Sequence, residues 1–130
     1  MNNLYELIVS LEELERERMA VLEMEARITK PVISDLERMD EVYEAFREIR
    51  PDKDARSIFL LIAVRLFCPK AIVRNMGHGV RRKVANVLKC KPTVVSHAYE
   101  NLVFHYKQYQ GFRKEVDEVY GRLCGKLGIE

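Results

Sequence analysis

No segment of this sequence is apolar for long enough to cross a membrane. The longest apolar run covers residues 58–64 and reaches residue 67 with only Arg65 interrupting it, whereas a membrane-spanning helix needs about 20 apolar residues. The N-terminus has acidic residues and lacks a basic start followed by an apolar stretch, so we expect no secretory signal. The three cysteines cannot all pair with one another, and an odd, sparse set is typical of reduced thiols. These absences predict a cytoplasmic protein.

The usual signatures of metal sites and catalytic sites are also missing. There is no Cys-x-x-Cys, and His97 and His105 are eight residues apart, which is about 12 Å along a helix axis. Ser96 and His97 are adjacent, but neighbours on a helix point about 100° apart and do not form a catalytic dyad. No Gly-x-x-x-x-Gly-Lys-Ser/Thr loop occurs, so a phosphate-binding ATPase loop is excluded. We therefore expect no enzyme activity, no metal and no cofactor.

Charge is divided between the two ends of the chain. Residues 1–50 have thirteen acidic and seven basic side chains (net −6), whereas residues 51–130 have fifteen basic and seven acidic ones (net +8). Between Arg65 and Lys114, Glu100 is the single acid among eleven basic residues. This asymmetry predicts either a polyanionic partner or a solvated basic face. We expect an acidic helical region over 1–50 for packing or dimerisation and a basic domain over 51–130, together forming one compact unit.

Apolar spacing predicts an all-α helical bundle with a long N-terminal helix. From Asn3 to about Arg27, leucines recur at three- and four-residue steps in a heptad-like pattern that degrades at Arg18 and Glu25. This helix is expected either to pair with a second copy or to pack on its own chain. Further helices are expected from a capping box at 34–37 to residue 50, and at about 55–67, 69–75, 80–89, 93–109 and 112–127.

Local signals define how these helices begin and end. Ser34 is the expected N-cap of the second helix, because Glu37 follows it at capping-box spacing. The helix at 55–67 is apolar almost all round and is predicted to be the central buried element. Gly77 and Gly79 are expected to form a turn through positive φ, and Gly111 to separate the last two helices.

Residues 81–109 fit a helix-turn-helix. The small residue Ala85 lies where the two helices should cross, and a turn over 90–92 fits because Pro92 can begin a helix but cannot continue one. The usual turn glycine is missing, so Lys89 or Cys90 would have to adopt a left-handed conformation. The inward-facing apolar residues are expected to be Val84, Leu88, Val95 and Ala98.

With those residues inward, short polar side chains of the second helix would face outward, where they could meet base edges in the major groove of DNA. These are Thr93, Ser96, His97 and Asn101, with Glu100 beside them. Basic residues flank the motif as phosphate contacts should, because neutralised phosphates release counterions. The predicted phosphate contacts are Arg81, Arg82, Lys83, Lys89 and Lys91.

Residues 56–123 resemble the C-terminal DNA-binding domain of the bacterial replication initiator DnaA, a Trp-repressor-like helix-turn-helix fold. The resemblance depends on Arg56 before a long apolar helix, on Val84, Ala85 and Leu88, and on Thr-Val-Val-Ser-His-Ala at 93–98. It implies binding of double-stranded DNA, with Val94 also at the groove and Arg56 near a phosphate or base. The Gly-x-Arg-Asp-His that precedes this motif in the family is replaced here by Cys90-Lys91-Pro92, so the family's base preference does not transfer.

Two functional hypotheses follow. The first is a sequence-specific double-stranded DNA-binding protein, acting in transcription regulation or as a replication-initiator-like protein without ATPase, and dimeric through its N-terminal helix. The second is an all-helical interaction module whose basic half docks an acidic protein.

Overall fold

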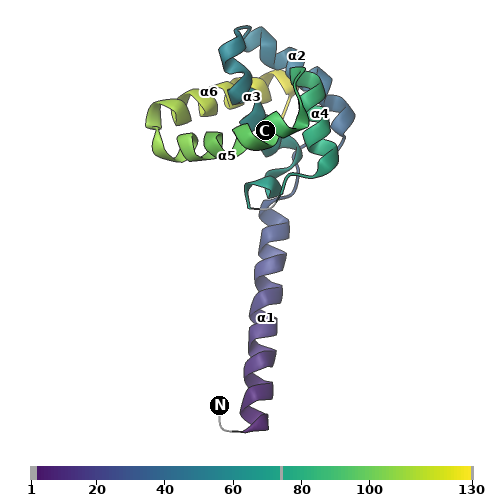
Figure 1. Ribbon diagram of the computed structural model, residues 1–130, viewed down its shortest axis with the longest axis vertical. Coiled ribbons are helices and arrows are strands. Elements are labelled where there is room, and N and C mark those ends of the chain that lie inside the picture. Colours follow the sequence, from purple (N-terminus) through teal and green to yellow (C-terminus); the bar gives the residue numbers. More distant parts are fainter. Residues whose placement is uncertain (1–2, 74, 130) are drawn as a thin grey trace. The chain divides into compact units, whose positions relative to one another are not determined.

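The computed structural model describes residues 3–73 and 75–129, and it confirms the all-α fold (Figure 1). The described residues contain six α-helices, three short 3-10 helices and no strand. The α-helices are α1 (Leu4–Ile28), α2 (Met39–Ile49), α3 (Arg56–Phe67), α4 (His78–Leu88), α5 (Pro92–Gln108) and α6 (Gln110–Leu127). The 3-10 helices are η1 (Leu36–Arg38), η2 (Lys53–Ala55) and η3 (Pro69–Ile72). None of the helices in the described ranges is long and apolar enough to cross a membrane.

The chain divides into two compact units, residues 1–30 and residues 31–130. Helix α2, whose acidic sequence groups it by charge with the N-terminal region, lies in the second unit, where it packs against α3, α4 and α6. Its apolar stripe explains this placement, because Met39, Val42 and Phe46 are all buried.

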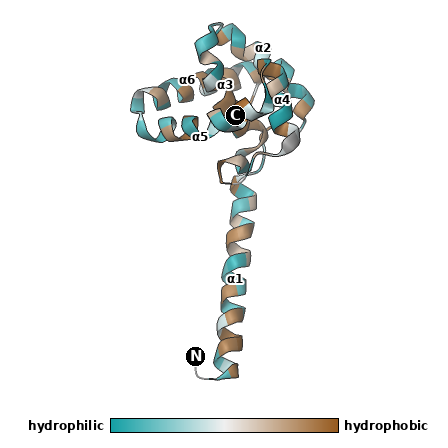
Figure 2. Cartoon of the chain, in the orientation of Figure 1, coloured by the Kyte–Doolittle hydropathy of each residue, from teal (hydrophilic) through white to brown (hydrophobic). Residues whose placement is uncertain are grey.

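The first unit consists of the single long helix α1. The Asn3 side chain caps its start by accepting the Glu6 amide N–H at 2.8 Å, and the helix ends at Ile28, one residue beyond the predicted end. At its other end, the backbone N–H and the hydroxyl of Thr29 both donate to the Glu25 carbonyl. Apolar and polar residues alternate along α1 (Figure 2). None of its residues is buried, and its larger apolar side chains are exposed.

Helix α3 is the centre of the second unit, as its apolar sequence predicted. Eight of its twelve residues are buried, and it packs against α2, α4, α5 and α6. Phe59 from α3 joins an aromatic cluster with two side chains of α2, its ring centroid lying 4.8 Å from that of Tyr43 and 5.3 Å from that of Phe46. Burial on this scale makes α3 the main source of apolar stabilisation in the unit.

The end of α2 is tied to α6 by ion pairs. Arg50 donates to Glu115 of α6 at 2.6 Å and to both carboxylate oxygens of Asp52, at 3.0 and 3.1 Å. The hydrogen bond from Arg50 lowers the pKa of the Asp52 carboxyl below its usual value. Further toward the C-terminus of α6, Lys126 pairs with Glu48 of α2. Helix α6 therefore closes the bundle against α2.

Three local predictions were wrong in detail. The cap after Pro31 is Asp35 and not Ser34: the Asp35 carboxylate accepts the Glu37 amide N–H at 3.0 Å, and a 3-10 turn precedes α2. Where a helix was predicted at 69–75, the described residues form the 3-10 helix η3, Pro69–Ile72, and residue 74 lies outside the described ranges.

The third error concerns the glycines at two helix boundaries. Gly77 has a φ of −57° and is the N-cap of α4, and Gly79 lies inside that helix. The predicted positive φ is not needed here, because a helix N-terminus requires no left-handed residue. The break between the last two helices is at Tyr109, whose backbone is extended, and Gly111 lies in the first turn of α6. In both places the chain changes direction through an extended residue, which any side chain permits.

Candidate nucleic-acid interface

Helix α4 is held in place by one apolar side. Val84 and Ala85 are almost fully buried, and Val87 and Leu88 are nearly so. These residues contribute to the core of the second unit, and α4 packs against both α3 and α5. The predicted inward orientation of Val84 and Leu88 is confirmed, and so is the burial of the small residue Ala85.

A three-residue turn, residues 89–91, joins α4 to α5. Lys89 has φ 57° and ψ 48°, so a lysine occupies the left-handed position that glycine usually fills. Its N–H donates to the Asn86 carbonyl at 3.3 Å, and the Cys90 N–H donates to the Ala85 carbonyl at 2.9 Å. This Schellman pattern satisfies two carbonyls at the end of α4. Pro92 then begins α5, one residue earlier than predicted.

Helix α5 has a buried side and an exposed side. Val95 and Tyr99 are buried and Ala98 is half-buried, and desolvation raises the pKa of Tyr99 to about 12. On the opposite side, Thr93, His97 and Asn101 are exposed at four-residue steps and so share one face. Val94 is also exposed, as are Glu100 and Phe104. Four of the five predicted base-reading residues (Thr93, Val94, His97 and Asn101) are therefore brought together on one accessible surface, defined here as the outer face of α5.

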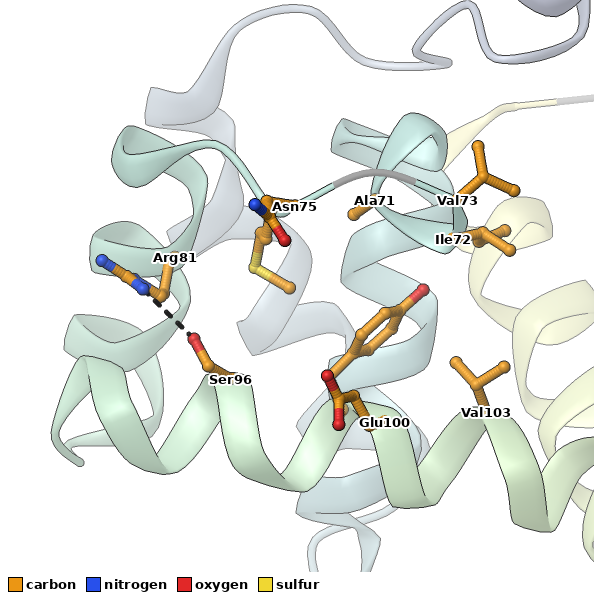
Figure 3. Close-up of a pocket in the computed structure, with 10 residues that line it drawn as sticks. Ala71, Ile72, Val73, Asn75, Arg81, Ser96, Glu100 and Val103 are labelled. Carbon is orange, nitrogen blue, oxygen red and sulfur yellow. Dashed lines mark hydrogen bonds between the residues drawn. The ribbon is translucent and has the colours of Figure 1, made fainter.

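Ser96, the fifth predicted base-reading residue, is turned toward α4. It is half-buried, and its hydroxyl accepts a hydrogen bond from Arg81 Nη1 at 3.3 Å. Figure 3 shows this pair at one end of a pocket of about 850 Å³, which Asn75 and Glu100 also line. Arg81 and Ser96 therefore help to join the two helices, and this geometry does not present Ser96 to a groove.

The basic residues of the motif fall into two groups. Arg82 on α4 is exposed, and so are Lys89 and Lys91 in the turn that directly precedes α5. Lys83 instead faces α2, where its ammonium lies 2.8 Å from Asp40 and 3.9 Å from Glu37. The hydrogen bond to Asp40 raises the pKa of Lys83.

Arg56 also makes its contact within the protein. Its guanidinium donates to the backbone carbonyl of Leu88, the last residue of α4. A cation at this point complements the negative end of the helix dipole and satisfies a carbonyl that has no partner within α4. Arg56 is therefore a positioning residue for the turn, and Lys83 positions α4 against α2.

The side chains that could bind metal are dispersed in the part of the chain that the structure describes. No group of three or more His, Cys, Asp or Glu side chains is assembled there. Cys68, Cys90 and Cys124 are free thiols, and His97 and His105 are exposed on α5. Ser96 accepts a hydrogen bond from Arg81, whose guanidinium is always a donor and cannot act as a general base.

Sequence reasoning missed the acidic partners that hold Lys83. The Lys83–Asp40 contact joins residues 43 positions apart, and no local pattern signals it. It also missed an apolar groove between α3, α5 and α6, because Arg65 was noted only as a basic residue and as an interruption of an apolar run, and neither signals that it lines a groove. Comparison of the chain with known protein families, curated proteins and solved structures finds no match.

Proposed function

We propose that the second unit binds double-stranded DNA through α4 and α5, with the first half of α5 in the major groove. The observation that carries the proposal is the outer face of α5. Its short polar residues begin directly after a turn that holds two exposed lysines, while the opposite side of the same helix is buried in the core. The major groove, about 12 Å wide, admits a helix in this way. Thr93, His97 and Asn101 are the proposed base contacts.

The exposed cations supply the proposed phosphate contacts. Lys89 and Lys91 lie directly before the N-terminus of α5, whose dipole also favours a phosphate, and Arg82 is exposed on α4, which packs against α5. Lys83 is excluded from this group because it pairs with Asp40, and Arg56 because it binds the Leu88 carbonyl. The resemblance of residues 56–123 to the DnaA domain supports the same docking mode. We propose on that basis a transcription regulator or a replication-initiator-like protein without ATPase.

The test is anisotropy of a labelled duplex of mixed sequence, titrated with protein across a salt series. The logarithm of affinity should fall steeply with the logarithm of salt concentration. Arg82→Gln and Lys91→Gln should each reduce the slope by about 0.9, the value of one phosphate contact. Lys83→Gln is the matched control, since it removes the same charge from α4 on the α2 side and should leave the slope unchanged. Absence of binding at the lowest salt would contradict the proposal.

A second candidate function, docking of an acidic protein, is favoured by one observation. Val94 and Phe104 are 51% and 56% exposed, and with His97 and Asn101 they form one stripe along α5. Exposed apolar side chains beside basic ones are typical of protein interfaces. Phe104→Ala distinguishes the two functions: it should leave the DNA affinity unchanged, because Phe104 lies three helical turns beyond the start of α5, but weaken binding of a protein partner.

We also propose that α1 pairs with α1 of a second copy. Considered by itself, this helix presents Leu4, Leu7, Leu11 and Leu14 at heptad spacing, and all four are exposed. Equilibrium sedimentation of the full chain should give a dimer. Leu11→Lys should give a monomer, whereas Glu13→Gln, which changes the charge by the same amount off the heptad seam, should remain dimeric. A clean monomer of the unmodified chain at micromolar concentration would indicate that α1 packs on its own chain instead.

A further inference from the structure

An apolar groove lies between α3, α5 and α6, next to the pocket of Figure 3. It encloses about 320 Å³, a volume at the lower end of the range typical of small-molecule sites. Its walls come from Leu61 of α3, Val103 of α5, and Val116 and Tyr120 of α6. Val116 is buried and the other three are half-buried, so the groove has an apolar floor and its walls are partly exposed to solvent.

Positive charge predominates at the rim of this groove. Arg65 and Lys107 line it, and both are exposed. The Arg65 guanidinium carbon lies 3.8 Å from the centre of the Tyr120 ring, so a cation–π contact fixes its position over the apolar wall. Within the described part of the chain, no carboxylate pairs with the Arg65 guanidinium.

The one acidic side chain of the groove is already engaged. Asp117 accepts the Tyr106 hydroxyl at 2.6 Å, which joins α5 to α6 and raises the pKa of Tyr106. Arg113 lies over the Tyr106 ring and donates to the Lys107 carbonyl at 2.7 Å, but it does not line the groove. Among the described residues, the groove therefore combines an apolar wall with two cations and one carboxylate. The pocket of Figure 3 differs, because its described lining residues carry one charge of each sign, Arg81 and Glu100.

We propose that this groove binds a small carboxylate with an apolar body, aliphatic or aromatic. The apolar body would lie against Leu61, Val103 and Val116, and the carboxylate would meet the guanidinium of Arg65 and the ammonium of Lys107. Arginine suits this role because its planar fork donates two parallel hydrogen bonds to a carboxylate. The proposal is independent of DNA binding, since it requires neither the outer face of α5 nor the turn at 89–91.

The test is isothermal titration of the full chain with octanoate, below the concentration at which it forms micelles. Octanoate should bind at one site per chain, and at least about ten-fold more tightly than octanol, which has the same apolar body without the charge. Arg65→Gln should weaken octanoate binding about ten-fold and reduce the preference over octanol. Arg122→Gln, which removes an exposed arginine of α6 that does not line the groove, should have no effect.

A second variant tests the apolar wall. Leu61→Trp should fill the groove and abolish binding of octanoate, with circular dichroism used to check that the variant is folded. Because Arg65→Gln changes only an exposed side chain, the proposal can be tested even if Leu61→Trp fails to fold. The proposal is overturned by absence of saturable octanoate binding, by equal affinities for octanoate and octanol, or by binding that Arg65→Gln leaves unchanged. Loss of DNA binding in a protein that binds octanoate would count against the proposed function alone.

Discussion

Val94 and Val95 are neighbours on α5 with opposite surroundings. Val95 is 2% exposed and belongs to the core, whereas Val94 is 51% exposed on the outer face. The same division applies along the helix, with Tyr99 on the buried side and Thr93, His97 and Asn101 on the exposed side. One side of α5 therefore carries the apolar pattern that determines folding. The other side is therefore able to vary in chemistry without loss of the fold.

The largest expected effect comes from placing a charge on each side of this division. Val95→Asp puts a carboxylate in the core with no cation to pair it, which costs several kcal/mol, comparable with the whole stability of a domain. The second unit should lose its cooperative thermal transition in circular dichroism. Val94→Asp is the matched control: its carboxylate is solvated and lies in the first turn of α5, where the helix dipole favours it. A cooperative transition in Val95→Asp would show that the buried side of α5 is not required for folding.

The next largest effect is a loss of DNA affinity, without loss of stability, in a variant of the outer face. In the folded Val94→Asp protein, the new carboxylate would lie beside the proposed phosphate and base contacts, and its repulsion should weaken duplex binding by ten-fold or more. Anisotropy at fixed salt measures this change. Val94→Ala, which truncates the same side chain without adding charge, should bind within a few-fold of the unmodified chain. Equal weakening by the two variants would argue for an apolar contact at this position and against electrostatic repulsion.

The sequence predicted the elements that depend on apolar periodicity. The nearly uniform apolar character of α3 predicted its burial, and the spacing of Val84, Leu88 and Val95 predicted the inner side of the helix pair. These predictions were correct because burial of apolar surface is the largest favourable contribution to folding and does not require knowledge of the particular neighbour. The outward orientation of Thr93, His97 and Asn101 followed from the same periodicity.

The sequence could not determine which neighbour each polar residue would meet. Arg56 binds a carbonyl 32 residues away and Lys83 a carboxylate 43 residues away, and both are placed by tertiary packing that local spacing does not encode. Ser96 was assigned outward from its helical position, but the reach of the Arg81 side chain from α4 engages it. Helix breaks were likewise assigned to glycines, although Tyr109 provides the extended residue that the chain requires. The DNA-binding role of the outer face remains a prediction.

A smaller effect is expected at the turn that joins α4 to α5. Arg56→Gln removes the guanidinium that donates to the Leu88 carbonyl and leaves a partly exposed carbonyl to water. Because the bond involves a charged donor, its loss should lower the free energy of unfolding by about 1.5 kcal/mol. Urea denaturation followed by circular dichroism measures the change. Lys53→Gln, an exposed charge removed from the neighbouring η2, should alter stability by less than about 0.5 kcal/mol. If the two variants changed the free energy of unfolding by similar amounts, Arg56 would not have the proposed positioning role.

The smallest expected effect is a gain in stability at Lys89. This residue has a φ of 57°, where a side chain costs about 1 kcal/mol relative to glycine. Lys89→Gly should therefore stabilise the second unit by at most about 1 kcal/mol, which for a unit of this size raises the melting temperature by at most about 4–8 °C. The gain is partly offset by the greater freedom of glycine in the unfolded chain.

Lys91 provides the matched control for this change. It lies two residues further along the same turn with a φ of −80° and a ψ of 145°, which lysine adopts without strain. Lys91→Gly removes the same charge but should lower stability slightly, since only the entropic cost of glycine remains. If Lys89→Gly were no more stable than Lys91→Gly, the left-handed residue would not be the point of strain in the turn. If Lys89→Gly were more stable but bound DNA less well, the result would indicate that lysine at this turn contributes its charge to DNA binding at a cost in stability.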